Sequence, residues 1–241
     1  MTYQLRDYQQ KASDAAVSFF NNKAKKTNAI MVLPTGSGKS LIIADIAARL
    51  DGHTLVFQPS KEILEQNFKK LCSYGILDCS IYSASLNSKE ISRITFATIG
   101  SVKNHPELFT HFKNIIVDEC HHAASNTESA VLKEIKAKYV YGVTAVDRTD
   151  QLDKMNFMLI GPIRHKYSAK EQAKQQGIPR LLYPRFTHVV APRGMMKDEK
   201  NPNEAYSILR DNDLRDQMII QDIKECIKKK RTPVVLSKYV N

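Results

Sequence analysis

Short apolar runs alternate with longer segments whose apolar residues recur at helical spacing through the first 150 residues. The apolar runs predict strands at 29–33, 53–57, 80–82, 94–98, 114–118 and 139–143. The segments with helical spacing predict helices at 8–21, 41–50, 62–72 and 126–138. This alternation predicts an α/β fold with a mostly parallel sheet flanked by helices, in which ligands bind at the carboxyl ends of the strands.

The last part of the chain has a different pattern. Residues 203–230 predict a helix with apolar anchors, and residues 233–238 predict a further strand. We therefore expect a first domain at 1–165, followed at 166–241 by a linker and a short, mainly helical extension.

A turn with two glycines joins the strand at 29–33 to the helix that follows it. Residues 33–40 read Leu-Pro-Thr-Gly-Ser-Gly-Lys-Ser, and the candidate phosphate-binding residues are Pro34, Thr35, Gly36, Ser37, Gly38, Lys39 and Ser40. Gly36 and Gly38 allow the backbone to wrap around a phosphate chain with its N–H groups inward, and the helix start adds a positive dipole end. Lys39 can reach the β- and γ-phosphates, and the Ser40 hydroxyl can bind Mg²⁺.

The apolar run at 114–118 ends in two adjacent carboxylates. Asp118 at the strand tip can hold Mg²⁺ through its waters, and Glu119 can orient the attacking water and take its proton. An all-apolar strand that ends in this way, downstream of a phosphate loop, favours nucleotide hydrolysis over a surface turn. His121 and His122 also allow a zinc site, but the sequence offers no partner at metal-ligand spacing.

A glutamine lies near the start of the first predicted helix. The amide of Gln9 can donate one hydrogen bond and accept another, which matches the edge of adenine. The alternative is a solvent-facing glutamine on an amphipathic helix.

Three stretches in chain order resemble the motifs of superfamily 2 helicases: Leu-Arg-Asp-Tyr-Gln at 5–9, Pro-Thr-Gly-Ser-Gly-Lys-Ser at 34–40 and Asp-Glu-Cys-His at 118–121. The strict phosphate-loop pattern has Gly at position 33, and this family tolerates the Leu found there. The nearest group comprises the DExH-box type III restriction enzyme helicase subunits and the XPB-like repair helicases. The resemblance implies the first RecA-like lobe of a P-loop NTPase, with ATP and Mg²⁺ as cofactors. It also implies that Gln9 reads adenine and that His121 links the ATP site to neighbouring motifs.

The resemblance extends to segments that hold nucleic acid in the family. Residues 56–66 are similar to motif Ia, and residues 98–102 are similar to motif Ib. Pro59, Ser60, Lys61, Thr98 and Ser101 are therefore candidates for contacts with backbone phosphates. Each segment also has a plainer interpretation, as a strand–helix junction or a set of capping residues.

Thr144 and Ala145 match the start of motif III, which couples hydrolysis to strand movement in the family. The family has Thr and Pro where this chain has Val146 and Asp147. This difference from the family affects the expected coupling of ATP hydrolysis to strand movement. The residues predicted to bind ATP are all present.

The charge of the chain favours nucleic acid as a partner. The net charge is +11, and residues 1–150 carry 18 basic and 15 acidic side chains against 18 and 10 in residues 151–241. A basic excess suits a polyanion, although a solubilising surface is the alternative. Together with the resemblance it predicts a nucleic-acid partner, with DNA favoured over RNA and a restriction or repair complex left open.

No apolar stretch approaches the ~20 residues that a membrane helix needs, and the N-terminus has no hydrophobic signal region. The four cysteines are scattered, so neither a disulfide framework nor a zinc site is supported. We expect no membrane partner and a cytoplasmic location.

Two functions fit these observations. The first is the ATP-binding lobe of an ATP-dependent DNA helicase or translocase, and the second is a nucleotide- or nucleic-acid-binding module with little or no ATPase activity. The resemblance places the arginines that meet the γ-phosphate in a second lobe, of which 166–241 would contain only the truncated start. The chain alone is therefore expected to hydrolyse ATP slowly. Another phosphate-loop enzyme, such as a kinase, is a third possibility, against which the Gln9 segment and the DExH box argue.

Overall fold

The computed structural model describes residues 4–22, 24, 28–122, 126–145, 158–177, 181–187, 189, 202–210 and 212–236. The chain forms two compact units, the first ending at Pro179 and the second beginning at Arg180. Val146, Asp147 and the end of the predicted strand at 233–238 lie outside the described residues.

The first unit is built on one sheet of eight strands. The strands are β1 (Ala29–Val32), β2 (Thr54–Gln58), β3 (Cys79–Ser83), β4 (Ser88–Lys89), β5 (Ile94–Thr98), β6 (Asn114–Asp118), β7 (Tyr139–Thr144) and β8 (Ile163–Lys166). Their order is β4-β3-β5-β2-β6-β7-β1-β8, and every pair is parallel except β3 with β4. The predicted α/β fold with a mostly parallel sheet is confirmed.

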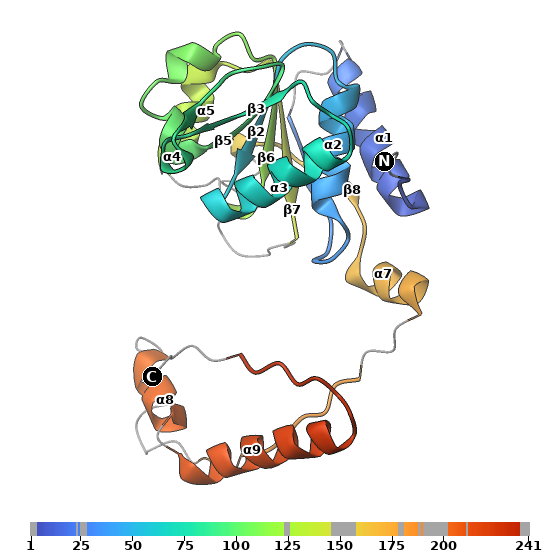
Figure 1. Ribbon diagram of the computed structural model, residues 1–241, viewed down its shortest axis with the longest axis vertical. Helices are drawn as coiled ribbons and strands as arrows, with labels where there is room; N and C mark the ends of the chain where they lie inside the picture. The colour runs from blue at the N-terminus through green and yellow to red at the C-terminus, as the bar shows by residue number, and fades with distance from the viewer. Residues whose placement is uncertain are drawn as a thin grey trace. The chain divides into compact units, whose positions relative to one another are not determined.

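Helices cover both faces of this sheet. One face carries α1 (Asp7–Asn21), α2 (Lys39–Arg49) and α3 (Lys61–Ser73), and the other carries α4 (Ile99–Val102) and α5 (Asn126–Ile135). Figure 1 shows α2 and α3 crossing the sheet on the side away from α4 and α5. Alternate strand residues point to opposite faces, so Met31 joins the core beneath α1 and α2, and Val32 joins the core beneath α5.

Short 3₁₀ turns complete the loops of this unit, at η1 (Ala84–Leu86), η2 (Pro106–Phe109) and η3 (Cys120–His122). The helix starts follow ordinary capping chemistry. Ser60 is the N-cap of α3, as predicted, and its hydroxyl accepts a hydrogen bond from the Ile63 N–H at 3.3 Å.

The end of the first unit differs from the sequence prediction. No strand is predicted at 163–166, but β8 pairs in parallel with β1 and adds an edge strand to the sheet. Its sequence, Ile-Arg-His-Lys, alternates half-buried and exposed side chains, which suits an edge strand and not a central apolar one. The chain continues into α7 (Ala169–Gln176), which begins with a capping box between Ser168 and Glu171.

In the second unit the predicted helix at 203–230 is two helices, α8 (Pro202–Arg210) and α9 (Asp213–Lys228). The side chain of Asn212 accepts a hydrogen bond from the Arg215 N–H at 2.9 Å, so Asn212 is the N-cap of a second helix, α9. The predicted strand beginning at Pro233 is wrong for its described part. Residues 233–236 have no strand partner among the described residues, and Val234 and Leu236 are 82% and 93% exposed. An apolar run of this kind needs a neighbouring strand before it can form a ladder.

Candidate active site

The strand order brings together three segments that are far apart in the sequence. The phosphate loop follows β1, Glu119 follows β6, and Ala145 follows β7, which lies between the other two strands in the sheet. Because the three strands are parallel, their carboxyl ends meet at one edge. The two strongest motifs of the sequence therefore face one another in space.

The phosphate loop has the backbone conformation that its glycines predict. Gly36 and Gly38 have φ angles of +75° and +82°, in the left-handed region that other residues rarely adopt. A Cβ atom on Gly38 would also lie 2.5 Å from Nε2 of Gln9. The helix α2 begins at Lys39, immediately after this turn, so its first N–H groups point toward the site.

The buried side chains of Tyr8 and Gln9 bind the outside of the loop. The Tyr8 hydroxyl and the Gln9 amide both donate to the carbonyl oxygen of Ser37, at 2.8 and 2.9 Å. The Oε1 atom of Gln9 accepts from the Arg6 N–H at 2.9 Å. An amide has two N–H groups and two lone pairs, so Gln9 retains one of each for a base. The sequence analysis gave Tyr8 no role of its own at the loop.

A cavity of about 320 Å³ opens beside Gln9 and the loop. It is lined by Arg6 and Gln9 on one side, by Gly36 and Gly38 of the loop, and by Lys70 and Tyr74 of α3 and its C-cap. A planar guanidinium and an aromatic ring suit a flat heterocycle, and the lysine adds a positive charge. Sequence reasoning missed Lys70 and Tyr74 because no local pattern relates α3 to the loop.

Lys39 forms an ion pair with Glu119, the candidate base. The side chains are 15% and 25% exposed, so solvent screens their charges only partly. The amine of the phosphate loop and the carboxylate of the DExH box thus occupy one site, as the motif interpretation requires. A bound triphosphate would compete with Glu119 for the ammonium group.

Asp118 is a buried carboxylate at the tip of β6. Burial raises its pKa to about 6, although the nearby Lys39 ammonium acts in the opposite direction. One carboxylate oxygen accepts the Glu119 N–H at 3.0 Å, and the second remains available. A desolvated carboxylate at the carboxyl end of the sheet, where the partly buried Ser40 also lies in the first turn of α2, fits a Mg²⁺ ion that keeps most of its waters and takes few protein ligands. The described residues contain no group of three or more acidic, His or Cys side chains that could enclose a metal by themselves.

The turn after β6 directs the DExH side chains to different partners. Glu119 has a φ of +51°, a left-handed conformation that is unusual for a glutamate and that reverses the chain here. His121 Nδ1 lies 3.3 Å from Glu119 Oε2 and 3.0 Å from the Thr144 hydroxyl. Cys120 is buried against Gly142 of β7, where a Cβ atom would lie 2.6 Å from its sulfur. Ala145 follows Thr144 and is half-buried.

The five nucleic-acid candidates lie at the ends of two other neighbouring strands. Pro59, Ser60 and Lys61 follow β2. Thr98 is the last residue of β5, the partner of β2 in the sheet, and Ser101 lies three residues later. Pro59 and Lys61 are exposed, and Ser60 and Thr98 are partly exposed. Ser101 is buried, and its hydroxyl bonds to Thr98 Oγ1 at 2.9 Å and accepts the Ala84 N–H at 3.0 Å. Ser101 therefore fixes the turn that presents Thr98.

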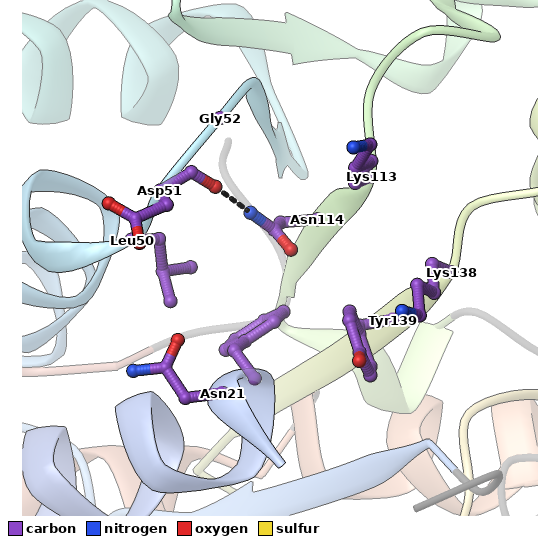
Figure 2. Close-up of a pocket in the computed structure, with 9 residues that line it drawn as sticks. Asn21, Leu50, Asp51, Gly52, Lys113, Asn114, Lys138 and Tyr139 are labelled. Carbon is purple, nitrogen blue, oxygen red and sulfur yellow. Dashed lines mark hydrogen bonds between the residues drawn. The ribbon is translucent and has the colours of Figure 1, made fainter. Parts of the chain in front are cut away.

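A second cavity, of about 280 Å³, lies at the amino ends of β6 and β7. Figure 2 shows its residues, among which the Asn114 amide donates to the Asp51 carbonyl oxygen at 3.0 Å. The amino ends of parallel strands lie at the opposite edge of the sheet from their carboxyl ends. This cavity is therefore separate from the phosphate loop and the DExH residues.

Comparison with known families agrees with the geometry. Residues 2–148 match the family described as type III restriction enzyme, res subunit. The chain belongs to this family. The match covers the phosphate loop, the DExH box and all five nucleic-acid candidates.

The proteins that the chain resembles include a translocase, a helicase and a restriction-modification enzyme by name. The DNA 3'-5' translocase XPB2 of Sulfurisphaera tokodaii is 30% identical over 172 residues, which is 70% of this chain and 37% of the relative. The UvsW helicase of bacteriophage T4 has the same fold, with a TM-score of 0.55 and 20% identity over 68% of this chain and 61% of that structure. The restriction-modification enzyme LlaGI, solved with a DNA substrate mimic, gives a TM-score of 0.55 and 18% identity over 73% of this chain and 21% of that structure.

The chain thus spans little more than a third of the length of the translocase that it matches. The predicted resemblance to superfamily 2 helicases of the type III restriction and XPB-like group, through the first RecA-like lobe, is confirmed. Among the described residues, every helix is too short or too polar to cross a bilayer.

Proposed function

We propose that this chain forms the ATP-binding lobe of an ATP-dependent DNA helicase or translocase. The observation that carries the proposal is the ion pair between Lys39 and Glu119, which are 80 residues apart in the sequence. A phosphate-gripping amine and a candidate base occupy one site, and Asp118 lies beside them. This is the set of groups that phosphoryl transfer to water requires.

Each group has a chemical task in the proposed reaction. The loop N–H groups and Lys39 bind the phosphate oxygens of ATP, and Glu119 orients the attacking water and accepts its proton. Asp118 and Ser40 would hold Mg²⁺, which supplies positive charge at the phosphate oxygens. His121, placed between Glu119 and Thr144, connects the reacting centre to the end of β7.

The nucleic-acid partner is proposed to be DNA and to lie across the carboxyl ends of β2 and β5. Exposed Lys61 and partly exposed Thr98 offer a cation and a hydroxyl to backbone phosphates there. The proposed preference for DNA over RNA is supported by the DNA translocase XPB2 and by LlaGI with its DNA substrate mimic, and a role in restriction is supported by LlaGI. Phosphate contacts alone do not distinguish these partners.

The proposed domain division keeps the RecA-like domain at 1–165 and a linker with the beginning of a second lobe at 166–241. The compact first unit extends to Pro179, because β8 and α7 pack with it. In this proposal the segment at 166–177 links the ATP site to the second lobe.

Calorimetry of ATP with Mg²⁺ tests the proposal directly. Lys39→Ala should abolish nucleotide binding while the circular dichroism spectrum stays unchanged, and Lys61→Ala should bind ATP like the wild type. The converse test is binding of labelled single-stranded DNA, double-stranded DNA and RNA of one sequence. If Lys39→Ala binds ATP as tightly as the wild type, the proposed site is wrong.

A further inference from the structure

The phosphate loop has a third anchor, which comes from outside the residues matched by the family. Gln172 of α7 is 2% exposed, and its Nε2 atom lies 3.4 Å from the carbonyl oxygen of Thr35. The same atom would lie 3.8 Å from a Cβ placed on Gly36. The side-chain amide of Gln172 therefore packs directly against the first glycine of the loop.

This contact fixes the direction of a peptide group. A trans peptide is planar, so its C=O and N–H point in opposite directions. An amide that holds the Thr35 oxygen on the outer side of the loop turns the Gly36 N–H toward the inner side. Tyr8 and Gln9 do the same to the peptide between Ser37 and Gly38 by holding the Ser37 oxygen. Alternate peptides of the loop are thus oriented by side chains from two elements, α1 and α7.

The elements that supply these anchors are joined to each other. The rings of Tyr8 and Tyr167 stack with centroids 4.4 Å apart and an interplanar angle of 6°. The Tyr167 N–H donates to the Val32 carbonyl oxygen at 3.0 Å, which continues the pairing of β8 with the strand that leads into the loop. A displacement of α7 therefore reaches the loop through both Gln172 and this stack.

Two buried polar atoms, one on Gln172 and one on the loop, have no hydrogen-bond partner within the described part of the chain. They are Oε1 of Gln172 and Oγ of Ser37. An unpaired buried acceptor destabilises the folded state, and an apolar side chain in the same place avoids this penalty. A bond of 3.4 Å is also long, and such bonds near reaction centres often shorten when the ligand binds. A polar residue at this position therefore suits a loop that tightens around phosphate.

We propose that Gln172 is a positioning residue for the phosphate loop, and that α7 responds to the nucleotide state of the loop. The inference rests on the proposed ATP site and adds to it. Gln172 contacts the outer side of the loop, so it acts through Gly36 and not on ATP itself. Its effect should be the same for any nucleotide that places phosphates in the loop.

The test compares Gln172→Met, which keeps the length of the side chain and removes the donor, with Lys174→Met. Lys174 is exposed on the same helix, so this variant controls for the substitution itself. We expect Gln172→Met to weaken ATP, ADP and GTP binding by a common factor of about 2–10, the range for one neutral hydrogen bond. The ratio of ATP to GTP affinity and the nucleotide-free melting temperature should stay unchanged.

A merely structural role for Gln172 would lower the nucleotide-free melting temperature, and unchanged affinities in Gln172→Met would also overturn the inference. If Gln172→Met does not fold, amide hydrogen exchange of the wild-type protein, measured with and without ADP, tests the proposal instead. Saturating ADP should slow exchange at both 34–40 and 169–176 but not in the middle of α5, and an unaffected α7 would refute the proposal. Failure of the proposed ATP site is distinguished from failure of this inference by Lys39→Ala. If the proposed site is wrong, that variant binds nucleotide like the wild type.

Discussion

His121 and Thr144 connect the ends of two neighbouring parallel strands through one imidazole ring. The Nδ1 atom of His121 lies 3.0 Å from the Thr144 hydroxyl oxygen and 3.3 Å from Glu119 Oε2. Glu119 is the proposed catalytic base, and Thr144 ends the strand β7 that lies between β1 and β6, the two strands that lead into the proposed ATP site. A change in the position of Glu119 is therefore transmitted to Thr144, the first residue of motif III, through the side chain of His121 alone.

Thr144→Val should break this connection while leaving the shape of the site intact. We expect ATP affinity to remain as in the wild type, and the effect of ATP on DNA affinity to fall about 3–10-fold, the loss of one hydrogen bond. The measurement is DNA binding by fluorescence anisotropy with and without a non-hydrolysable ATP analogue. Thr54→Val is the control. The Thr54 hydroxyl is buried without a partner in the described structure, and it lies at the amino end of β2, at the edge of the sheet opposite the proposed site. Equal coupling in Thr144→Val and the wild type would rule out this route.

Glu119→Gln should separate binding from hydrolysis. In the ion pair the Glu119 carboxylate neutralises the Lys39 ammonium group, so a nucleotide must displace this carboxylate before its phosphates can bind Lys39. A glutamine at position 119 has no negative charge and does not compete with the phosphates. We expect ATP to bind about 3–10-fold more tightly, in keeping with a partly buried ion pair, and phosphate release to fall to background. Glu134→Gln, an exposed change on α5, should alter neither quantity. Weaker ATP binding by Glu119→Gln would show that the carboxylate helps to hold the nucleotide.

Much of the fold could be predicted because its signals are local. The apolar runs at β5 and β6 and the glycines of the loop determine their own backbone, and the structure has strands at Ile94–Thr98 and Asn114–Asp118 as predicted. The same holds for the cap at Ser60, whose hydroxyl needs only the N–H three residues later.

The parts that could not be predicted depend on contacts between distant segments. β8 is half polar and becomes a strand only because the edge of β1 is available. Gln172 and Tyr8 reach the loop from 137 and 29 residues away, and no spacing rule relates them to it. Residues 233–236 show the opposite behaviour to β8. Their apolar, β-branched sequence predicts a strand, but they have no neighbouring strand among the described residues and do not form one.

The buried carboxylate of Asp118 should make Mg²⁺-dependent ATP binding sensitive to pH. Burial raises its pKa to about 6, so the ionised form that attracts a cation predominates above that pH and is lost below it. We expect ATP affinity in Mg²⁺ to fall as the pH drops from 7.5 to 5, with a midpoint near 6. Asp118→Asn should show only the pH dependence that comes from protonation of ATP itself. Parallel profiles for the two proteins, measured by calorimetry, would exclude this role for Asp118.

Gln9 should select adenine over guanine. Its amide already donates to the Ser37 oxygen and accepts from the Arg6 N–H, which leaves one donor and one acceptor for the base. We expect the wild type to bind ATP about 10-fold more tightly than GTP, and Gln9→Ala to lose most of that difference together with some affinity for both. Competition against a fluorescent nucleotide measures both ratios. Equal affinities for ATP and GTP in the wild type would remove Gln9 from base recognition.

The exposed amine of Lys61 should contribute one phosphate contact to DNA binding. Lys61 begins α3 directly after the Ser60 cap, at the carboxyl end of β2, where a helix start also favours an anion. Each neutralised phosphate steepens the fall of affinity with salt, so Lys61→Ala should weaken binding of all DNA sequences alike and reduce the salt slope by about 1. Lys69→Ala is the matched control, because Lys69 lies two turns further along the same helix and pairs with Glu65 at 2.7 Å. The measurement is anisotropy of labelled DNA over a series of salt concentrations. If Lys69→Ala reduces the slope as much as Lys61→Ala, the contribution comes from net charge and not from a defined contact at the end of β2.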